Sequence, residues 1–505
     1  MINVLNSNQS KRLDALSINQ NFDLDNLIDN AGKSLSIHIL ENVSNPFNKT
    51  FLCISGIGNN GLDSIVCNYY LNKNNVKSDV LIINPDMINS KYLKKYASKF
   101  KYLNIDNVDD LSKYDWIVDG MFGTGFNRDM EGLYLKLSKK LENHKNILSI
   151  DIPSGVYTDT GNSANSHIKA RETITFTYPK ICHFFGDGYA NSGELHIYPI
   201  GHLDNYNNDV NIELIERLDI CSLIKSENKN SNKYSNKKVI SVCGSKRYTG
   251  ALLLSNSSAM RSGVKILRKI IPSSLKEISF QHFESIDILI EDENKGYLGL
   301  EDYDKIIKEL LWSDTLLIGP GLDESKDSVL LMSKILKSYA GLCIIDASAF
   351  LPIINGELEI NDIPEYSILT PHYGEFAKIL NISIDELHNN TIEILDEFSK
   401  KLSNRILILK GPNTVIMTGS GNKYIIDNGN SLLSTAGTGD VLSGIITGYL
   451  SNGYSLLDSS ILGAYLHSEC SSYLSKRGYD TIIASDLLPL IPKVQYDLRN
   501  SVDET

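Results

Sequence analysis

The segment 434–448, STAGTGDVLSGIITG, combines residue types that could bind a phosphate group and act on a hydroxyl beside it. A Gly-Thr-Gly turn that leads into a helix presents unpaired backbone N–H groups and the positive end of the helix dipole, and both attract anions. Asp440 follows this turn, and an apolar face with helical spacing begins at Val441. A carboxylate there either caps the helix, which stabilises it by about 1 kcal/mol, or acts on a substrate hydroxyl. Gly437 and Gly439 exceed what a cap needs, so we favour an anion hole with Asp440 as the reacting group.

Three further groups in the second half of the chain fit a site that uses a nucleotide. Gly319 and Gly321, in IGPGL, would let the backbone approach a ligand closely. His372 lies in TPHYGE, and Lys410 follows the strand-like run ILIL. Each has a plain alternative, because a single histidine often makes only a structural hydrogen bond and most lysines lie on the surface. Together with Asp440 they supply what phosphoryl transfer to a hydroxyl requires, and the absence of a GxxxxGK[ST] motif argues against a P-loop fold.

Glycine-rich loops in the first half each follow an apolar, strand-like run. They read GIGNNGLDS at 56–64, DGMFGTGF at 119–126 and DIPSGVYTDTG at 151–161. The first predicts a turn into a helix that starts near Ser64 and could hold a phosphate group, although such loops are often only turns. The third places the Asp151 carboxylate and the Ser154 hydroxyl on a turn stiffened by proline. Because ligands of open α/β sheets bind beyond the carboxyl ends of the strands, we expect the three loops to meet at one crevice.

The elements that would position these residues alternate along the chain. Residues 1–45 are expected to form helices without a strand, and apolar runs then predict strands at 51–55, 79–83, 115–119, 146–151, 172–178 and 194–198. Such alternation predicts a doubly wound parallel sheet. The second half repeats it, about seven times in all, with strands or strand ends at 237–244, 314–322, 341–349, 366–375 and 405–417 and helices at 438–452, 459–475 and 485–498.

The interval between the two halves differs in composition. Residues 202–236 are rich in Asn, Ser and Lys, which predicts a linker with a short helix at 211–224. We therefore expect two α/β domains of three α/β/α layers, a Rossmann-like one over 1–210 and a second over 237–505, joined by the linker 211–236. A chain of 505 residues is long enough for two full cores.

Composition narrows the functional class and the compartment. The net charge of −12 and the lack of a basic stripe argue against a nucleic-acid partner. The seven cysteines are scattered, form no Cys-x-x-Cys pair and are typical of small buried apolar residues in a reducing cytoplasm. The N-terminus has no run typical of a signal peptide, and no apolar run approaches the length of a membrane span. We expect a soluble cytoplasmic protein that does not bind a membrane.

The motifs, taken as a set, resemble a known enzyme family. The second half resembles the ribokinase-like superfamily and, within it, the ADP/ATP-dependent NAD(P)H-hydrate dehydratases, through YTGA (248–251), IGPGL (318–322), TPHYGE (370–375), KGPNTVI (410–416), AGTGDVLSG (436–444) and ASDLLPLIP (484–492). The first half, with the three loops and TFTYPK (175–180), resembles the NAD(P)H-hydrate epimerases. The order of the halves matches the bifunctional NAD(P)H-hydrate repair enzymes over nearly the whole chain.

The resemblance implies site residues in the first half. The hydrate of NADH or NADPH would be held by Asn59, Asn60, Gly61, Leu62, Asp63, Gly123, Thr124, Gly125, Phe126, Asn127, Arg128 and Asp129. Asp151 would contact the hydrated nicotinamide ring as the acid/base. Asn60, Asp119 and Ser154 would bind K⁺. This half would interconvert the R and S epimers of the hydrate.

The resemblance also implies site residues and cofactors in the second half. Gly321, His372 and Asp440 would contact the S-hydrate, with Asp440 as the catalytic base. ADP or ATP, with Mg²⁺ bridging its phosphates, would be held by two segments. The first comprises Lys410, Gly411, Pro412, Asn413 and Thr414. The second runs from Asn430 to Gly439 and includes Thr435, Ala436, Gly437, Thr438 and Gly439. The hydrate hydroxyl would be phosphorylated and then leave as phosphate, restoring NAD(P)H. Family resemblance also suggests ADP as the donor and a homo-oligomer.

Two positions depart from the family pattern. The family shows NNGGDG where this chain has NNGLDS, and Leu62 would cost about 1 kcal/mol if its backbone had to be left-handed. Ser64 likewise adds a side chain beside the expected phosphate. The family also tends to have Asp where Ser348 stands in DASAF.

Two rival functions fit parts of the same pattern. A small-molecule kinase of the ribokinase-like superfamily would explain Asp440 and the anion hole but would leave residues 1–200 without a purpose. In the second rival, the first half is a binding module that has lost epimerase activity, which the changes at Leu62 and Ser64 would explain.

Overall fold

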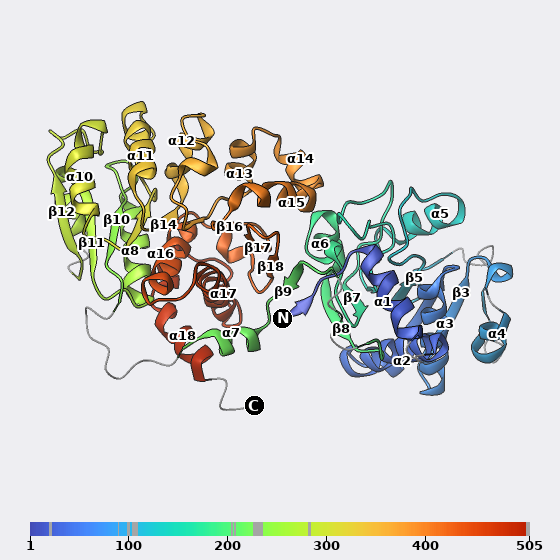
Figure 1. Ribbon diagram of the computed structural model, residues 1–505. Coiled ribbons are helices and arrows are strands. Elements are labelled where there is room, and N and C mark those ends of the chain that lie inside the picture. The colour runs from blue at the N-terminus through green and yellow to red at the C-terminus, as the bar shows by residue number, and fades with distance from the viewer. Residues whose placement is uncertain are drawn as a thin grey trace. The chain divides into compact units, whose positions relative to one another are not determined.

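The computed structural model describes residues 1–19, 23–88, 90–97, 102–103, 110–203, 206, 209–225, 236–280 and 284–500. The chain divides into two compact units. The N-terminal unit comprises Ile2–Ile212, and the C-terminal unit comprises Glu213–Thr505 together with Met1 (Figure 1).

A seven-stranded parallel sheet forms the centre of the N-terminal unit. The strand order is β4 (Tyr102–Leu103), β3 (Lys77–Ile82), β2 (Thr50–Ser55), β5 (Trp116–Gly120), β6 (Ile147–Ile150), β7 (Glu172–Phe176) and β8 (Glu194–Tyr198). Every neighbouring pair is parallel. The six predicted strands are therefore confirmed, and so is the doubly wound class.

Helices cover both faces of this sheet (Figure 1). The unit contains α1 (Ser7–Asn19), α2 (Leu24–Asn42), α3 (Asn59–Lys73), α4 (Ser90–Tyr92), α5 (Gly132–Leu141), α6 (Gly186–Ser192) and the short turns η1 (Pro46–Asn48), η2 (Pro85–Met87), η3 (Leu93–Ala97) and η5 (Ile181–His183). Alternate residues of β2 point to opposite faces, so Phe51 packs with α2 and α3 and Leu52 packs with α5. The expectation of no strand before residue 45 is wrong, because β1 (Ile2–Asn3) is a short strand.

A mixed sheet forms the centre of the C-terminal unit. From β9 (Ile212–Leu214) the order is β18 (Lys423–Ile426), β17 (Thr414–Thr418), β16 (Ile406–Leu409), β15 (Ser367–Leu369), β14 (Leu342–Ile345), β13 (Thr315–Ile318), β10 (Val239–Val242), β11 (Leu267–Pro272) and β12 (Ile286–Ile290). The pairs from β16 to β12 are parallel, whereas β16, β17 and β18 pair antiparallel. The predicted β/α alternation fails at β16 because residues 410–413 are too few for a crossover and allow only a hairpin.

The helices of the C-terminal unit pack on both faces of its sheet (Figure 1). They are α7 (Arg217–Leu223), α8 (Thr249–Arg261), α9 (Lys276–Ser279), α10 (Tyr303–Leu310), α11 (Lys326–Ser338), α12 (Leu351–Ile354), α13 (Tyr373–Leu380), α14 (Ile384–Asn389), α15 (Thr391–Leu402), α16 (Thr438–Ser451), α17 (Leu456–Ser475) and α18 (Leu490–Asn500). The short turns are η6 (Ser273–Leu275), η7 (Leu300–Asp302), η8 (Ala347–Phe350), η9 (Ile360–Asp362), η10 (Ser431–Ser434) and η11 (Ala484–Leu487).

Helix α16 is the most enclosed of the helices that carry predicted site residues. It packs against α8 on one side and α17 on the other. A Cβ on Gly444 would lie 1.9 Å from Ser258 Oγ of α8, so only glycine permits this approach. The face of α16 that carries Gly444 therefore receives α8, and the close packing fixes the position of the helix N-terminus.

Two boundaries differ from the sequence prediction. Helix α3 begins at Asn59, not near Ser64, so the asparagines of the first loop lie in its first turn. The interval expected to be a linker contains the predicted short helix, as α7, but it also contains the strand β9, and its Ile220 and Ile224 are buried in the core of the C-terminal unit. Residues 226–235 lie outside the described residues. No helix in the described ranges combines the length and apolarity that crossing a membrane requires.

Candidate active sites

The N-terminus of α16 has the backbone geometry of an anion site. Gly437 is the N-cap with φ of 91°, and the Thr438 hydroxyl bonds to the carbonyls of Leu433 and Thr435, which closes the turn. The N–H groups of the first helical turn lack intrahelical partners, so those of Gly439 and Asp440 can face a ligand. A carbon placed on Gly439 would lie 3.3 Å from Lys410 Nζ. An ammonium group therefore lies beside the positive end of this helix.

Three carboxyl groups surround that ammonium group. Lys410 Nζ is 2.9 Å from Oδ1 of buried Asp346, and Glu375 and Asp440 are also close enough to interact with it. Burial opposes the charged ammonium, but the three acids outweigh burial and raise the pKa of Lys410. Burial, with the negative charges of Asp346 and Glu375, raises the pKa of Asp440 to about 7, against the opposing effect of Lys410. Asp440 is thus poised to exchange a proton near neutral pH.

His372 lies beside this site as the N-cap of α13. Its Nδ1 accepts hydrogen bonds from the backbone N–H groups of Gly374 and Glu375, and its side chain is 58 % exposed. The backbone of His372 also bridges to Lys410, which brings the two predicted residues together. Because Nδ1 is occupied by the cap, only Nε2 can face a ligand.

The other predicted residues of this half lie at the same end of the sheet, beyond the carboxyl ends of its parallel strands. Gly321 follows β13 and is buried next to Tyr248 and Ala251. The turn from β16 to β17 holds Gly411, Pro412 and Asn413, and Thr414 begins β17. Asn430 caps η10, and Thr435 and Ala436 lead from η10 into α16.

Three residues near α16 were missed by the sequence analysis. Asp346 follows β14, so the strand-end rule that singled out Asp151 could have found it. Glu375 lies in the quoted motif TPHYGE, but its role beside Lys410 depends on the fold. His467 lies in the interior of α17, where no pattern marks it, and burial lowers the pKa of its ring to about 4.

A separate cavity lies at the carboxyl ends of the strands in the N-terminal unit. Its wall includes, from three helices and three loops, Asp14, Leu27, Asn59, Asn60, Asp63, Thr124, Asp151 and Lys180. Five of the residues predicted from the loops therefore line one cavity. Asp14 and Lys180 were not predicted as site residues, although Lys180 ends the quoted motif TFTYPK.

Asp151 has a strained backbone, and one oxygen of its carboxylate is bound by Lys180 and Thr175. Its φ is 65°, a left-handed value that is rare for a residue with a side chain. Its Oδ1 accepts hydrogen bonds from Lys180 Nζ and, at 2.9 Å, from Thr175 Oγ1. His183 Nδ1 accepts from the backbone N–H of Lys180, so its Nε2 carries the proton and donates to the Asp151 carbonyl. Burial lowers the pKa of His183 to about 4, which keeps the ring neutral in this role.

Two carboxyl groups of this cavity have pKa values that are shifted in opposite directions. Burial opposes ionisation of Asp151, but Lys180 outweighs it and holds the pKa of Asp151 below its ordinary value. Asp63 has no such cation, and burial together with the charge of Asp151 raises its pKa well above the ordinary value. The two carboxyl groups on this wall thus have pKa values shifted in opposite directions, which is the relation that a general acid and a general base require.

The three residues predicted to hold K⁺ converge around the backbone of Phe122. Asn60 Nδ2 donates to the Phe122 carbonyl at 3.0 Å, and the Phe122 N–H donates to Ser154 Oγ at 3.0 Å. Asp119 is fully buried and accepts from Ser154 Oγ at 2.7 Å and from the Ser154 N–H at 3.0 Å. Carboxylate, amide and hydroxyl oxygens suit a hard cation, so the donor chemistry fits K⁺.

The other residues predicted for the first half lie in the loop after β5 and at the start of α3. Residues 123–129 form the loop between β5 and α5 and comprise Gly123, Thr124, Gly125, Phe126, Asn127, Arg128 and Asp129. A Cβ on Gly123 would collide with the Asn60 side chain, which places this loop against α3. Leu62 lies in the first turn of α3 and its backbone is not left-handed, so the cost of about 1 kcal/mol considered for a left-handed Leu62 does not apply. Ser64 Oγ donates to the Gly61 carbonyl.

Comparisons with known proteins match both units. Residues 24–182 match the family model for the YjeF-related protein N-terminus, and residues 239–493 match that for NAD(P)H-hydrate dehydratase. Relatives called bifunctional NAD(P)H-hydrate repair enzyme Nnr include one from Dictyoglomus turgidum, 29 % identical over 92 % of this chain and 93 % of its own, and one from Escherichia coli, 26 % identical over 89 % and 85 %. A solved ADP/ATP-dependent NAD(P)H-hydrate dehydratase from Bacillus subtilis, co-crystallised with ATP and Mg²⁺, is 25 % identical with a TM-score of 0.50 over 57 % of this chain and 99 % of its own.

Proposed function

Because this chain belongs to the NAD(P)H-hydrate dehydratase family and joins that domain to a YjeF-related one, we propose that it repairs hydrated NADH and NADPH with two activities. The N-terminal unit interconverts the R- and S-hydrates, and the C-terminal unit dehydrates the S-hydrate at the expense of ADP or ATP. The observation that carries the proposal is the N-terminus of α16, where a glycine turn, Lys410 and a proton-accepting Asp440 meet.

In the dehydration step, Asp440 takes the proton of the hydrate hydroxyl as that oxygen attacks the terminal phosphorus of ATP or ADP. The bond from this phosphorus to the bridging oxygen breaks, and ADP or AMP leaves. The N–H groups of Gly439 and Asp440 and the Lys410 ammonium stabilise the phosphate charge that develops. The C–O bond then breaks, phosphate leaves with the electron pair, and loss of a ring proton restores the double bond of the reduced nicotinamide. Phosphorylation is needed because hydroxide is a poor leaving group. Mg²⁺, when bound, would neutralise charge between the nucleotide phosphates.

The nucleotide and substrate contacts of this unit extend over the predicted segments. We propose that Gly411, Pro412, Asn413 and Thr414, with Thr435, Ala436, Gly437 and Thr438, contact the nucleotide, and that Gly321 and His372 contact the hydrate. Their position on the side of the sheet that carries Asp440 supports this assignment.

In the epimerisation step, Asp151 is the base and protonated Asp63 supplies the matching acid. Lys180 keeps Asp151 ionised, and His183 holds its backbone in place. K⁺ held by Asn60, Asp119 and Ser154 would fix the loop that carries Phe122 and stabilise negative charge on a bound dinucleotide. The buried, free state of all seven cysteines supports the cytoplasm as the compartment. A homo-oligomer remains a proposal from the family resemblance.

The products distinguish repair from the kinase alternative. Incubation of chemically prepared NADH hydrate with ADP or ATP should release one phosphate for each reduced nicotinamide recovered. Accumulation of a stable phosphorylated dinucleotide without recovery of NADH would instead support a small-molecule kinase.

A further inference from the structure

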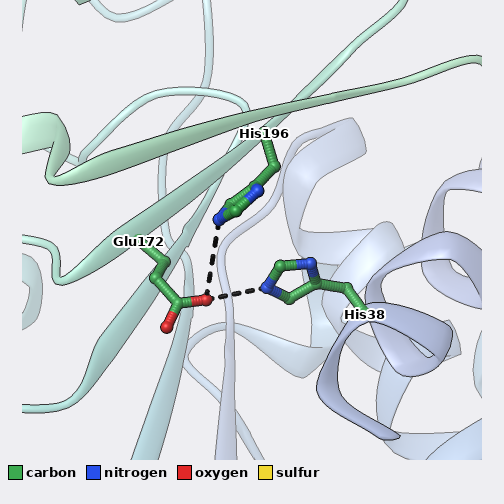
Figure 2. Close-up of side chains that lie close together, drawn as sticks. All are labelled: His38, Glu172 and His196. Carbon is green, nitrogen blue, oxygen red and sulfur yellow. Dashed lines mark hydrogen bonds and ion pairs between the residues drawn. The ribbon is translucent and has the colours of Figure 1, made fainter. Parts of the chain in front are cut away.

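Three side chains that neither proposed activity uses converge at the start of β7 (Figure 2). His38 comes from α2, Glu172 is the first residue of β7, and His196 comes from β8. The epimerase cavity lies at the other end of the same strands, where Phe176 ends β7. The cluster is therefore separate from that cavity.

The ligand atoms of the three residues face one another. Glu172 Oε2 lies 2.7 Å from His38 Nε2 and 3.9 Å from His196 Nε2, and all three atoms lie within 4.8 Å of one another. Ligands of a tetrahedral zinc ion with bonds of about 2.0 Å lie about 3.3 Å apart, so the two measured separations bracket that value. Two imidazoles and one carboxylate are a ligand set that zinc-class cations prefer.

The groups around the cluster orient the ligands. His38 Nδ1 lies 3.1 Å from the Tyr198 hydroxyl, so a proton on Nδ1 can be donated to that oxygen while Nε2 stays free to bind a metal. Arg171 faces the other oxygen of Glu172, at 3.9 Å from Oε1, and leaves Oε2 to the histidines. Glu194, the register partner of Glu172 on β8, offers a second carboxylate, with Oε1 at 3.8 Å from His196 Nε2.

The His196 ring has an unmet hydrogen-bonding need. Its Nε2 is buried and has no hydrogen-bond partner among the described residues. Its ring centroid lies 4.5 Å from that of His38, so one cation could contact both rings. A cation bound between the two imidazoles would give the buried Nε2 a partner.

We propose that His38, Glu172 and His196 bind a divalent transition-metal cation of the zinc class, with water or Glu194 as the fourth ligand. The bound cation ties α2 to the strands β7 and β8. The same helix lines the epimerase cavity through Leu27 and Ile28, so the cation fixes one wall of that cavity without touching the substrate.

Zinc binding to the full chain tests this proposal. After chelator treatment and buffer exchange into excess Mg²⁺ and K⁺, calorimetric titration should give one tight Zn²⁺ site per chain, and Co²⁺ should give the visible absorption of a bound ion. His196→Gln should weaken Zn²⁺ binding by about 100-fold or more. His167→Gln, which changes an exposed histidine of the same unit, is the matched control and should bind as the parent does.

Thermal unfolding gives a second readout that does not depend on either enzyme activity. Zn²⁺ should raise the Tm of the parent and of His167→Gln but leave His196→Gln unchanged. Failure of Zn²⁺ to bind the parent, or equal Zn²⁺ binding by His196→Gln, would overturn the metal site and would leave the repair function untouched.

Discussion

At the scale of single residues, two aspartates of the proposed sites have pKa values shifted in opposite directions: Asp151, which follows β6, and Asp440, in the first turn of α16. Asp151 binds its lysine directly, so it stays ionised. The lysine near Asp440 instead pairs with Asp346, and Asp440 keeps a pKa of about 7. Sequence motifs identified both aspartates. The motifs could not show which acid each lysine would bind, because Lys180 and Lys410 lie far in the sequence from Asp151 and Asp346 and meet them only in the folded chain.

The pKa of Asp440 predicts the pH dependence of dehydration. Below about pH 7 the carboxyl group is protonated and cannot accept the hydroxyl proton, so kcat/KM should rise as the pH increases through that region. The measurement is the initial rate of NADH recovery at low substrate from pH 5.5 to 8.5. A flat profile in the parent protein would contradict the role of Asp440 as base.

The buried pair of Asp151 and Lys180 predicts a pH-dependent stability. A carboxyl group with a lowered pKa stabilises the fold above its ordinary pKa of about 4 and loses this effect as the pH falls through the lowered value. Lys180→Met leaves the buried carboxylate unpaired and should cost about 3–5 kcal/mol at pH 7, and less near pH 4, in the free energy of unfolding by urea.

The double variant Asp151→Asn/Lys180→Met controls for the loss of the lysine side chain itself. It should recover much of the lost stability, because no buried charge remains. A Lys180→Met variant as stable as the parent at pH 7 would show that the pair is not buried as described.

At the scale of elements, the ends of parallel strands carry the proposed chemistry, as the sequence analysis expected. Apolar runs predicted the strands because both faces of the sheets are buried. The start of α3 was placed five residues late, because Asn59 and Asn60 look like turn residues but lie in the first helical turn. His372 was predicted as a ligand-contacting residue. Its Nδ1 caps α13, and the sequence did not indicate this role because it depends on local backbone geometry.

A substitution in the turn before α16 should change the KM for the nucleotide, and a control variant separates this effect from the loss of folding stability. Gly437→Ala places a methyl group on a left-handed backbone, 2.7 Å from Leu254 Cδ1. Gly478→Ala is the matched control, because Gly478 is also left-handed, with φ of 84°, but nothing lies within 4 Å of its Cβ position. Each variant should lose about 1–2 kcal/mol of stability from backbone strain.

Only Gly437→Ala should raise the KM for ADP or ATP, by about tenfold or more, since it alone displaces the N–H groups that face the phosphates. The measurement is NADH recovery at saturating hydrate with varied nucleotide. An equal KM in the two variants would mean that the turn does not hold the nucleotide.

At the scale of the whole molecule, two complete cores carry two sets of reactive groups. The antiparallel strands after β16 and the packing of β9 and α7 on the C-terminal core could not be predicted from periodicity, because each depends on loop length and on distant packing. The two reactive sets share no residue, so the two activities should be separable by substitution.

A single substitution in one unit should therefore abolish one activity and leave the other intact. With an equal mixture of R- and S-hydrates, Asp151→Asn should stop after the S-half is consumed, apart from slow spontaneous epimerisation. Chromatography of the two epimers over time measures this directly. Complete consumption of both epimers at the parent's rate would instead support a non-catalytic N-terminal module.

The recovery of reduced-nicotinamide absorbance from S-NADH hydrate, with and without ADP or ATP, tests whether the N-terminus of α16 performs nucleotide-dependent dehydration. The parent should restore the absorbance only with nucleotide, and Asp440→Asn should be slower by about 10²–10⁴-fold, the contribution of a general base. Nucleotide binding by the variant should persist. Recovery without nucleotide, or a variant within twofold of the parent, would contradict the assignment of dehydration to the N-terminus of α16.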